Sequence, residues 1–138
     1  MLYLHRAKKP ETLRKVAEMV ATSNPDAILT GTYYIAREEN EDGKTIVGCI
    51  GLRRRGWHST ELHHLFVIPE ERGKGIGKFL VESAEKRVKS PLCCCTIVAE
   101  NETSISLHLG LGYRVAEEFT NTPTGRRVCF FTKRVQQP

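Results

Sequence analysis

A glycine-rich segment in the middle of the chain separates a strand-like pattern from a helix-like one. Its chemistry-bearing residues are Arg72, Gly73, Lys74, Gly75 and Gly77. Glycines allow positive φ and a close approach of the backbone to a ligand. The first N–H groups of the following helix have no partner inside it, so they bind anions with the help of the helix dipole. The segment therefore predicts a site for a phosphate-bearing ligand.

Two common phosphate-binding motifs do not describe this segment. A P-loop needs Gly-x-x-x-x-Gly-Lys-Ser/Thr, which the chain lacks. A Rossmann fingerprint needs repeated strand–helix–strand units, whereas the strand patterns here are rich in hairpin signals. A flexible connection is the plain alternative, and the strand before and amphipathic helix after the glycines argue against it.

The elements that must position this turn follow from apolar periodicity and turn residues. Helices are expected to begin at Pro10, Ile76 and Glu102. A hairpin turn is expected at Asp42-Gly43 and a basic turn at Arg53–Gly56. The expected strands are Leu2–His5, Thr30–Arg37, Thr45–Leu52, His58–Ile68, Pro91–Ala99, Gly112–Thr120 and Arg127–Arg134. The order of elements predicts an α+β fold with a mixed sheet.

Composition indicates an ordinary folded protein. The 138 residues fit one domain, 1–138, with one hydrophobic core, and no apolar stretch reaches the length of a membrane helix. The N-terminus has no basic start followed by an apolar run, so no secretory signal is expected. The net charge of +5 suits an anionic partner without naming one.

The cysteines favour buried thiols over a metal site or disulfides. Cys49, Cys93–Cys95 and Cys129 make an odd number, and no Cys-x-x-Cys pair occurs. Unpaired thiols are typical of a reducing cytosol, so a cytoplasmic protein without a bound metal is expected. Cys93–Cys95 lie in a strand pattern, where alternate thiols should face opposite sides of the sheet. Cys94 is the thiol to test for an acyl-cysteine role.

The glycine segment and a later pattern together resemble the GNAT superfamily of N-acetyltransferases. The first pattern is Arg72-x-x-Gly75-x-Gly77, preceded by Leu65-Phe66-Val67 and Pro69. The second consists of Asn101, Ser104, Leu107, Gly112 and Tyr113. The resemblance covers nearly the whole chain and implies the GNAT fold. That fold is a mixed, mostly antiparallel sheet of six to seven strands, with helices on both faces and a splayed pair of parallel central strands. The pair would be His58–Val67 and Pro91–Ala99.

The resemblance implies acetyl-CoA as cosubstrate and assigns residues to it. The pyrophosphate would rest on the glycine turn, and the pantetheine would pair with the strand at Phe66–Ile68. The N–H of Val67 would hydrogen-bond the thioester carbonyl and stabilise the oxyanion. Asn101 either caps a helix, contacts the pantetheine, or does both. The implied cofactor-binding residues are Phe66, Val67, Ile68, Arg72, Gly73, Lys74, Gly75, Ile76, Gly77, Lys78 and Asn101.

The acceptor amine arrives protonated, so a base is needed, and the departing thiolate can use an acid. Glu61 and His63 match the base positions of two branches of the family and should share one face of their strand. His64 should point the opposite way. His108 stands where many members of the family have a tyrosine that acts as the general acid. Each candidate also has a purely structural interpretation: Glu61 and His63 as solvated strand residues, and His108 as a helix-surface residue.

The sequence therefore predicts transfer of acetyl from acetyl-CoA to a primary amine by direct attack in a ternary complex. A non-catalytic acyl-CoA-binding module and a basic nucleic-acid-binding protein are the alternatives. The arginine run Arg53–Arg55 supports the nucleic-acid alternative, but no recognisable nucleic-acid motif accompanies it. Peptide or protein amines and small molecules both remain open as acceptors. A homodimer is also open, and no membrane partner is expected.

Overall fold

The computed structural model describes residues 1–135 and places them in two compact units. The N-terminal unit consists of Met1–Arg53 and Leu62–Arg87, and the C-terminal unit of Arg54–Glu61 and Val88 onward. Backbone pairing joins seven strands in the order β1-β2-β3-β4-β5-β7-β6. The expected α+β fold with a mixed sheet is confirmed, whereas a single domain over residues 1–138 stays a prediction.

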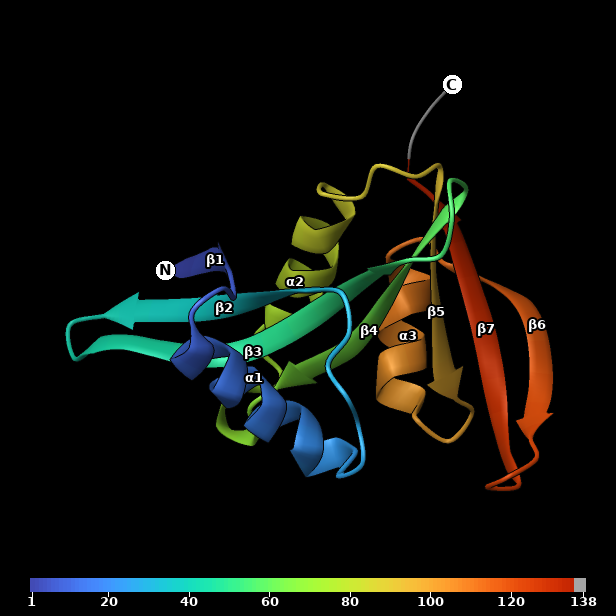
Figure 1. Cartoon of the computed structure of the whole chain (residues 1–138), viewed down its shortest axis with the longest axis horizontal. Helices are drawn as coiled ribbons and strands as arrows, with labels where there is room; N and C mark the ends of the chain where they lie inside the picture. Colours follow the sequence, from blue (N-terminus) through green and yellow to red (C-terminus); the bar gives the residue numbers. More distant parts are fainter. Residues whose placement is uncertain (136–138) are drawn as a thin grey trace. The chain divides into compact units, whose positions relative to one another are not determined.

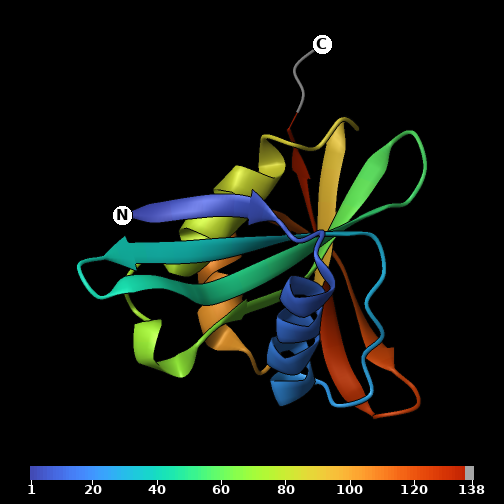
Figure 2. The same cartoon turned by 60° about the vertical axis from the view of Figure 1, so that its left-hand side comes forward.

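The N-terminal unit holds the first strands and two helices (Figures 1 and 2). The antiparallel strands β1, β2 and β3 lie side by side, and β4 continues into a short 3₁₀ turn and then α2. The bounds are β1 Leu2–Arg6, α1 Pro10–Ser23, β2 Thr32–Asn40, β3 Gly43–Arg54, β4 Ser59–Val67, a 3₁₀ turn at Pro69–Glu71, and α2 Ile76–Glu85.

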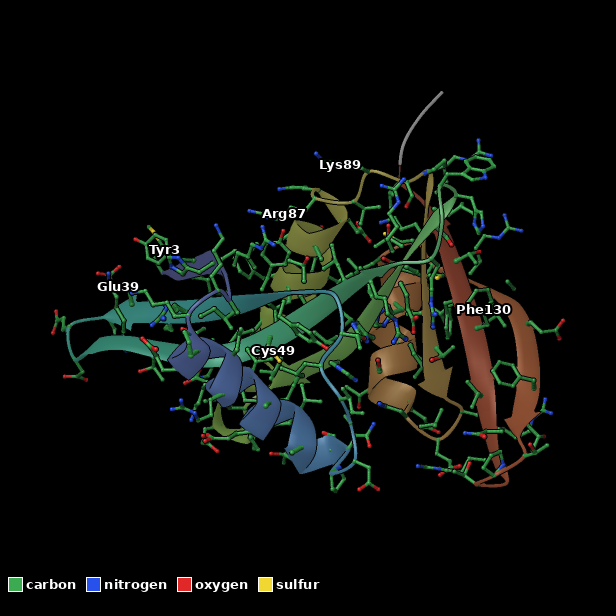
Figure 3. The ribbon with its side chains drawn as sticks, viewed as in Figure 1. Tyr3, Glu39, Cys49, Arg87, Lys89 and Phe130 are labelled. Atoms are coloured by element: carbon green, nitrogen blue, oxygen red, sulfur yellow. The ribbon has the colours of Figure 1, made fainter. Side chains whose placement is uncertain are left out.

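The two helices of this unit cover opposite faces of β2 and β3. Cys49 of β3 belongs to the apolar cluster that α1 forms with this face, and Figure 3 labels it there. Its neighbour Gly48 faces α2, because a Cβ at that position would lie 3.0 Å from Leu80 Cδ1. Successive strand residues point to opposite faces, so helices on both faces are confirmed for this unit.

The C-terminal unit contains the first residues of β4 and the later elements. Its strands β5, β7 and β6 are antiparallel neighbours, and β6 forms the exposed end of the series (Figure 1). The bounds are β5 Leu92–Val98, α3 Glu102–Gly110, β6 Arg114–Asn121 and β7 Arg126–Arg134. Phe131 of β7 and Cys93 of β5 are fully buried.

The turns differ slightly from expectation. The β2–β3 turn uses Glu41 and Asp42, with Gly43 already opposite Asn40 in the ladder. The Asn40 side chain accepts the Asp42 N–H at 2.9 Å, which stabilises this earlier turn. The basic turn expected at Arg53–Gly56 also begins later, because β3 continues through Arg54. No helix among residues 1–135 is long and apolar enough to cross a membrane.

Candidate active site

The glycine turn between β4 and α2 has the backbone that the sequence predicted. Gly73 and Gly75 have φ of +81° and +84°, the left-handed region that favours glycine. A Cβ at either position would have no neighbouring atom within 4 Å. Gly75 is the N-cap of α2, and no side chain caps that helix. The first N–H groups of α2 are therefore available to an anion at an open surface.

Two cations border this turn, and each already has a partner. Arg72 Nε donates to the Val67 carbonyl at 2.9 Å, and its guanidinium lies 5.5 Å from the Phe66 ring centre. Lys74 Nζ lies 2.8 Å from Glu71 Oε2. The hydrogen bond to Glu71, and then the charge of the same carboxylate, raise the pKa of the Lys74 ammonium. The turn is therefore less positive than its sequence suggests.

The backbone of β4 alternates in the direction of its hydrogen-bonding groups. Ile68 donates its N–H to Val47 of β3 at 2.9 Å, so the Ile68 amide is committed to the sheet. The adjacent Val67 groups point away from β3, because N–H groups alternate sides along a strand. Of the expected residues Phe66, Val67 and Ile68, Val67 is thus the one whose N–H faces away from β3.

Three further residues expected to bind the cofactor are Ile76, Lys78 and Asn101. Ile76 is buried, so only its backbone N–H can reach an anion, whereas Lys78 is exposed. Asn101 caps α3, because its Oδ1 accepts the Ser104 N–H at 3.1 Å. The capping interpretation of Asn101 is confirmed, and its contact with pantetheine stays a prediction.

Within the C-terminal unit, the first residues of β4 pair in parallel with the start of β5. The paired residues run from Ser59–Leu92 to Glu61–Cys94. Within the C-terminal unit, Thr60 Oγ1 and Ser90 Oγ lie 2.8 Å apart beside this ladder. The expected parallel pair is confirmed.

The Glu61 carboxylate is held by an arginine. Arg55 Nε donates to Glu61 Oε1 at 2.8 Å, and the Glu61 side chain is 13% exposed. Its ladder partner Cys94 is a poor nucleophile, because burial and then the Glu61 charge raise the pKa of this thiol. All five cysteines are buried thiols outside any disulfide. Among residues 1–135 no group of three or more His, Cys, Asp or Glu side chains could hold a metal ion.

His63 and His64 lie together, which corrects the expectation that His64 points away. His64 has φ of +55°, a left-handed conformation that costs a non-glycine residue roughly 1–2 kcal/mol. The irregularity turns the His64 ring onto His63, so the ring centres are 4.3 Å apart and stacked. The Cys49 thiol donates to the His64 carbonyl at 3.5 Å, and the Tyr33 hydroxyl lies 2.7 Å from His64 Nδ1.

Comparison with known proteins decides the family. The model of the Acetyltransferase (GNAT) family matches residues 4–113. The chain belongs to this family. It is therefore an acetyltransferase, in agreement with the resemblance that the glycine motif carries. No curated protein sequence matches it.

Solved GNAT structures share the fold at low sequence identity. A GNAT acetyltransferase from Elizabethkingia anophelis with acetyl-CoA bound has a TM-score of 0.79 and 16% identity, covering 96% of this chain and 97% of its own. NAA60 from Arabidopsis thaliana in complex with a bisubstrate analogue has a TM-score of 0.79 and 13% sequence identity, and the match covers 99% of this chain and 100% of that chain. The ribosomal-protein-S18-alanine N-acetyltransferase of Escherichia coli has a TM-score of 0.74 and 13% sequence identity, and the match covers 100% of this chain and 96% of that chain.

In this GNAT chain His108 is a core residue and not a helix-surface one. It is 4% exposed. Its ring packs edge-on with Tyr113, with ring centres 5.2 Å apart, and is tilted relative to Phe131, with ring centres 6.4 Å apart. Its Nδ1 lies 2.8 Å from the Ser104 carbonyl oxygen, which can only accept, so Nδ1 carries a hydrogen. Any proton that His108 gives to a substrate must therefore leave from Nε2.

Three residues beside the candidate bases were missed from the sequence. Thr30 and Tyr33 reach the histidines across about thirty positions of the chain, and no local pattern signals such contacts. Arg55 stands six positions before Glu61 across a hairpin. Opposite charges flanking that turn were a usable signal for the Arg55–Glu61 pair.

Proposed function

We propose that this GNAT acetyltransferase transfers the acetyl group of acetyl-CoA to a primary amine, by direct attack within a ternary complex. The observation that carries the proposal is the turn at Gly73 and Gly75. Both glycines have positive φ and open space around them, and they precede an uncapped helix N-terminus. This arrangement suits the pyrophosphate of a coenzyme A ester.

The cofactor would use the turn and the adjacent end of β4. The N–H groups at Ile76–Lys78 would bind phosphate oxygens, and exposed Lys74 and Lys78 would add charge. Val67 would direct its N–H to the thioester carbonyl, which becomes negative when the amine attacks. Phe66 is buried beneath Arg72, so its contribution would be to hold the β4 backbone in place.

The nitrogen loses two protons in the reaction and the sulfur gains one. An ammonium acceptor gives its first proton to the base and becomes a nucleophilic amine. The amine nitrogen then bonds to the acetyl carbon, the C–S bond breaks, and the thiolate leaves with the electron pair, while the nitrogen releases its second proton to solvent as the neutral amide forms. Glu61 and His63 are the proposed bases, and His108 Nε2 is the proposed proton donor to the thiolate. The Arg55 guanidinium already contacts Glu61 Oε1, and for this reason we propose His63 as a second base.

The structurally similar proteins do not identify the class of acceptor amine, which has to be determined by experiment. Their names include an acetyltransferase for a ribosomal-protein alanine, one for phosphinothricin and one for aminoglycosides. At 13–16% identity these proteins share only the fold with this chain. A cytoplasmic location and a homodimer likewise stay predictions.

The test is release of coenzyme A from acetyl-CoA with a panel of amines. The panel should contain α-amino and lysine peptides, aminoglycosides and small aliphatic amines. We expect release above the rate of hydrolysis with one class of amine, and a product heavier by one acetyl group in mass spectrometry. Acetyl-CoA binding without transfer to any amine in a broad panel would contradict the proposed reaction.

A further inference from the structure

The turn between β3 and β4 holds the only tryptophan of the chain in solvent. Trp57 is 76% exposed. The three-residue loop that carries it is closed by a hydrogen bond from the Arg55 N–H to the Ser59 carbonyl at 2.9 Å. Gly56, the first residue of the loop, has φ of +126°, which other residues rarely adopt. A short, closed loop therefore presents a large planar ring at a defined position.

Three cationic side chains lie at the same end of the C-terminal unit as this loop (Figure 1). The His58 carbonyl accepts the Leu92 N–H at 3.1 Å, which joins the loop to the start of β5. Leu92 is opposite Arg134 in the β5–β7 ladder, so the end of β7 lies there too. The three cations are Arg54, Lys89 and Arg134, and all are exposed. Figure 3 labels Lys89, which precedes β5.

These three cations give this end of the unit an excess of positive charge. Within residues 1–135, none of the three forms an ion pair with a carboxylate. The neighbouring Arg55 is different, because it is paired with Glu61 and adds little net charge. Arg54 Nε donates to the Gly56 carbonyl at 2.8 Å, which holds the guanidinium beside the tryptophan loop. Its two terminal nitrogens remain available as donors to a ligand.

The combination of a planar ring and a guanidinium held beside it indicates the chemistry of a partner. Guanidinium groups bind phosphate oxygens through paired hydrogen bonds. An exposed indole stacks on nucleic-acid bases, and such stacking tolerates any base sequence. In a duplex the bases already stack on one another, whereas a single strand offers their flat faces. An acidic polypeptide would match the charge but would offer no flat face to Trp57.

We propose that the β3–β4 turn binds single-stranded nucleic acid, with Trp57 stacked on a base and with Arg54, Lys89 and Arg134 on backbone phosphates. The net charge of +5 favours the approach of such a polyanion. None of these residues belongs to the proposed acetyltransferase site, so this binding goes beyond the proposed function.

The fluorescence of Trp57 gives the first test, because no other tryptophan contributes to the signal. We expect single-stranded oligothymidylate to quench it. The same strand annealed to oligoadenylate should quench it less at equal phosphate concentration, since paired bases do not stack on the indole. Polyglutamate carries negative charge without bases and tests the acidic-polypeptide alternative. Equal quenching by polyglutamate and by oligothymidylate would overturn the assignment to nucleic acid.

Variants separate the turn from the general positive charge of the chain. With a fluorescently labelled oligothymidylate, Trp57→Ala should weaken binding roughly tenfold or more. Its control is Phe119→Ala, which removes another exposed ring of the same unit. Arg54→Gln should weaken binding and lower the slope of log affinity against log salt by about 0.7. Its control, Arg14→Gln, removes the same charge from the exposed side of α1. Equal affinities within either pair of variants would overturn the proposal.

The glycine turn before α2 is a second place where phosphates could bind, so the titration needs a control for that site. We expect saturating coenzyme A to leave the affinity for oligothymidylate unchanged. The Gly75→Glu variant should also bind the oligonucleotide like the parent, because Trp57 and the three cations are intact in it. Displacement of the oligonucleotide by coenzyme A, or its loss in Gly75→Glu, would place the nucleic acid on the cofactor turn and overturn the proposal.

Discussion

Arg55 Nε lies 2.8 Å from Glu61 Oε1, so the carboxylate that the sequence presents as a base is already engaged by a cation. The pair spans the turn between β3 and β4 within the C-terminal unit. The Arg55 side chain is half exposed, at 52%, and that of Glu61 is largely covered. The ion pair holds the Glu61 carboxylate in one orientation.

Two substitutions at this pair should act differently. Glu61→Gln should lower kcat by about 10²-fold at neutral pH with little change in acetyl-CoA affinity, because it removes one of the two proposed bases and no phosphate contact. Arg55→Gln keeps the carboxylate and removes only the cation that orients it, so kcat should fall by less than in Glu61→Gln. Steady-state kinetics from pH 5.5 to 9 measure both effects. Full activity of Glu61→Gln at every pH would make Glu61 a structural residue.

The ion pair beside the glycine turn gives a prediction for cofactor affinity. Glu71→Gln should strengthen acetyl-CoA binding by roughly two- to fivefold, because it frees Lys74 and removes a negative charge near the phosphates. The gain should shrink as salt rises, since exposed charges are screened. Glu100→Gln is the control, because it breaks an exposed pair with Arg126 elsewhere in the chain. Equal affinity of Glu71→Gln and Glu100→Gln variants would contradict an electrostatic role for Lys74.

Buried thiols predict a loss of stability in alkaline solution. Burial raises the pKa of Cys49 and of Cys95 from 9.0 to about 12. Because the folded state keeps the thiol protonated, the contribution of each thiol to the free energy of unfolding is fully present below pH 9. That contribution is lost as the pH rises from 9 toward 12. Each thiol contributes a slope of about 1.4 kcal/mol per pH unit in that window. Urea unfolding at several pH values measures it, and Cys49→Ala should show a shallower slope.

The same burial predicts slow thiol labelling. A disulfide reagent at pH 8 should react slowly with the native chain and rapidly with the urea-unfolded chain, where five thiols become available. Rapid reaction of one thiol in the native protein would show that a cysteine is exposed, and its modification should then be mapped.

His108 can be tested with a residue that keeps one nitrogen. The side-chain amide of Asn at position 108 can replace Nδ1 as donor to the Ser104 carbonyl, but it has nothing in place of Nε2. We expect His108→Asn to lose about 10²-fold in kcat while acetyl-CoA still binds. Thermal unfolding of the variant serves as the control for packing against Tyr113 and Phe131. Unchanged kcat would leave His108 with a purely structural role.

The order of elements was predictable because apolar periodicity and turn residues act locally. The helix starting at Pro10 and the glycine turn before Ile76 both appear where the sequence predicted them. The hairpin beginning at Glu41 differed by one residue, since an Asn40 side-chain hydrogen bond decided the turn. Local chemistry thus predicts where elements lie better than where they end.

The surroundings of the candidate bases were not predictable in the same way. Nothing in the sequence indicates that His64, a non-glycine strand residue, adopts φ of +55°. Its conformation depends on contacts from Tyr33 and Cys49, which belong to other strands. Sequence alternation placed His64 opposite His63, and tertiary packing overrode it. Residue identity therefore indicated the chemistry, whereas long-range hydrogen bonds determined the geometry.

The most direct test of the account is calorimetric titration of acetyl-CoA into the parent, Gly75→Glu and Gly125→Glu. Both glycines have positive φ, and a Cβ at either position would have no atom within 4 Å, so the two substitutions impose similar backbone strain. Only Gly75 lies in the turn before α2. We predict saturable binding to the parent and to Gly125→Glu, and none to Gly75→Glu. Parent-like affinity in Gly75→Glu would contradict the claim that the glycine turn binds the cofactor.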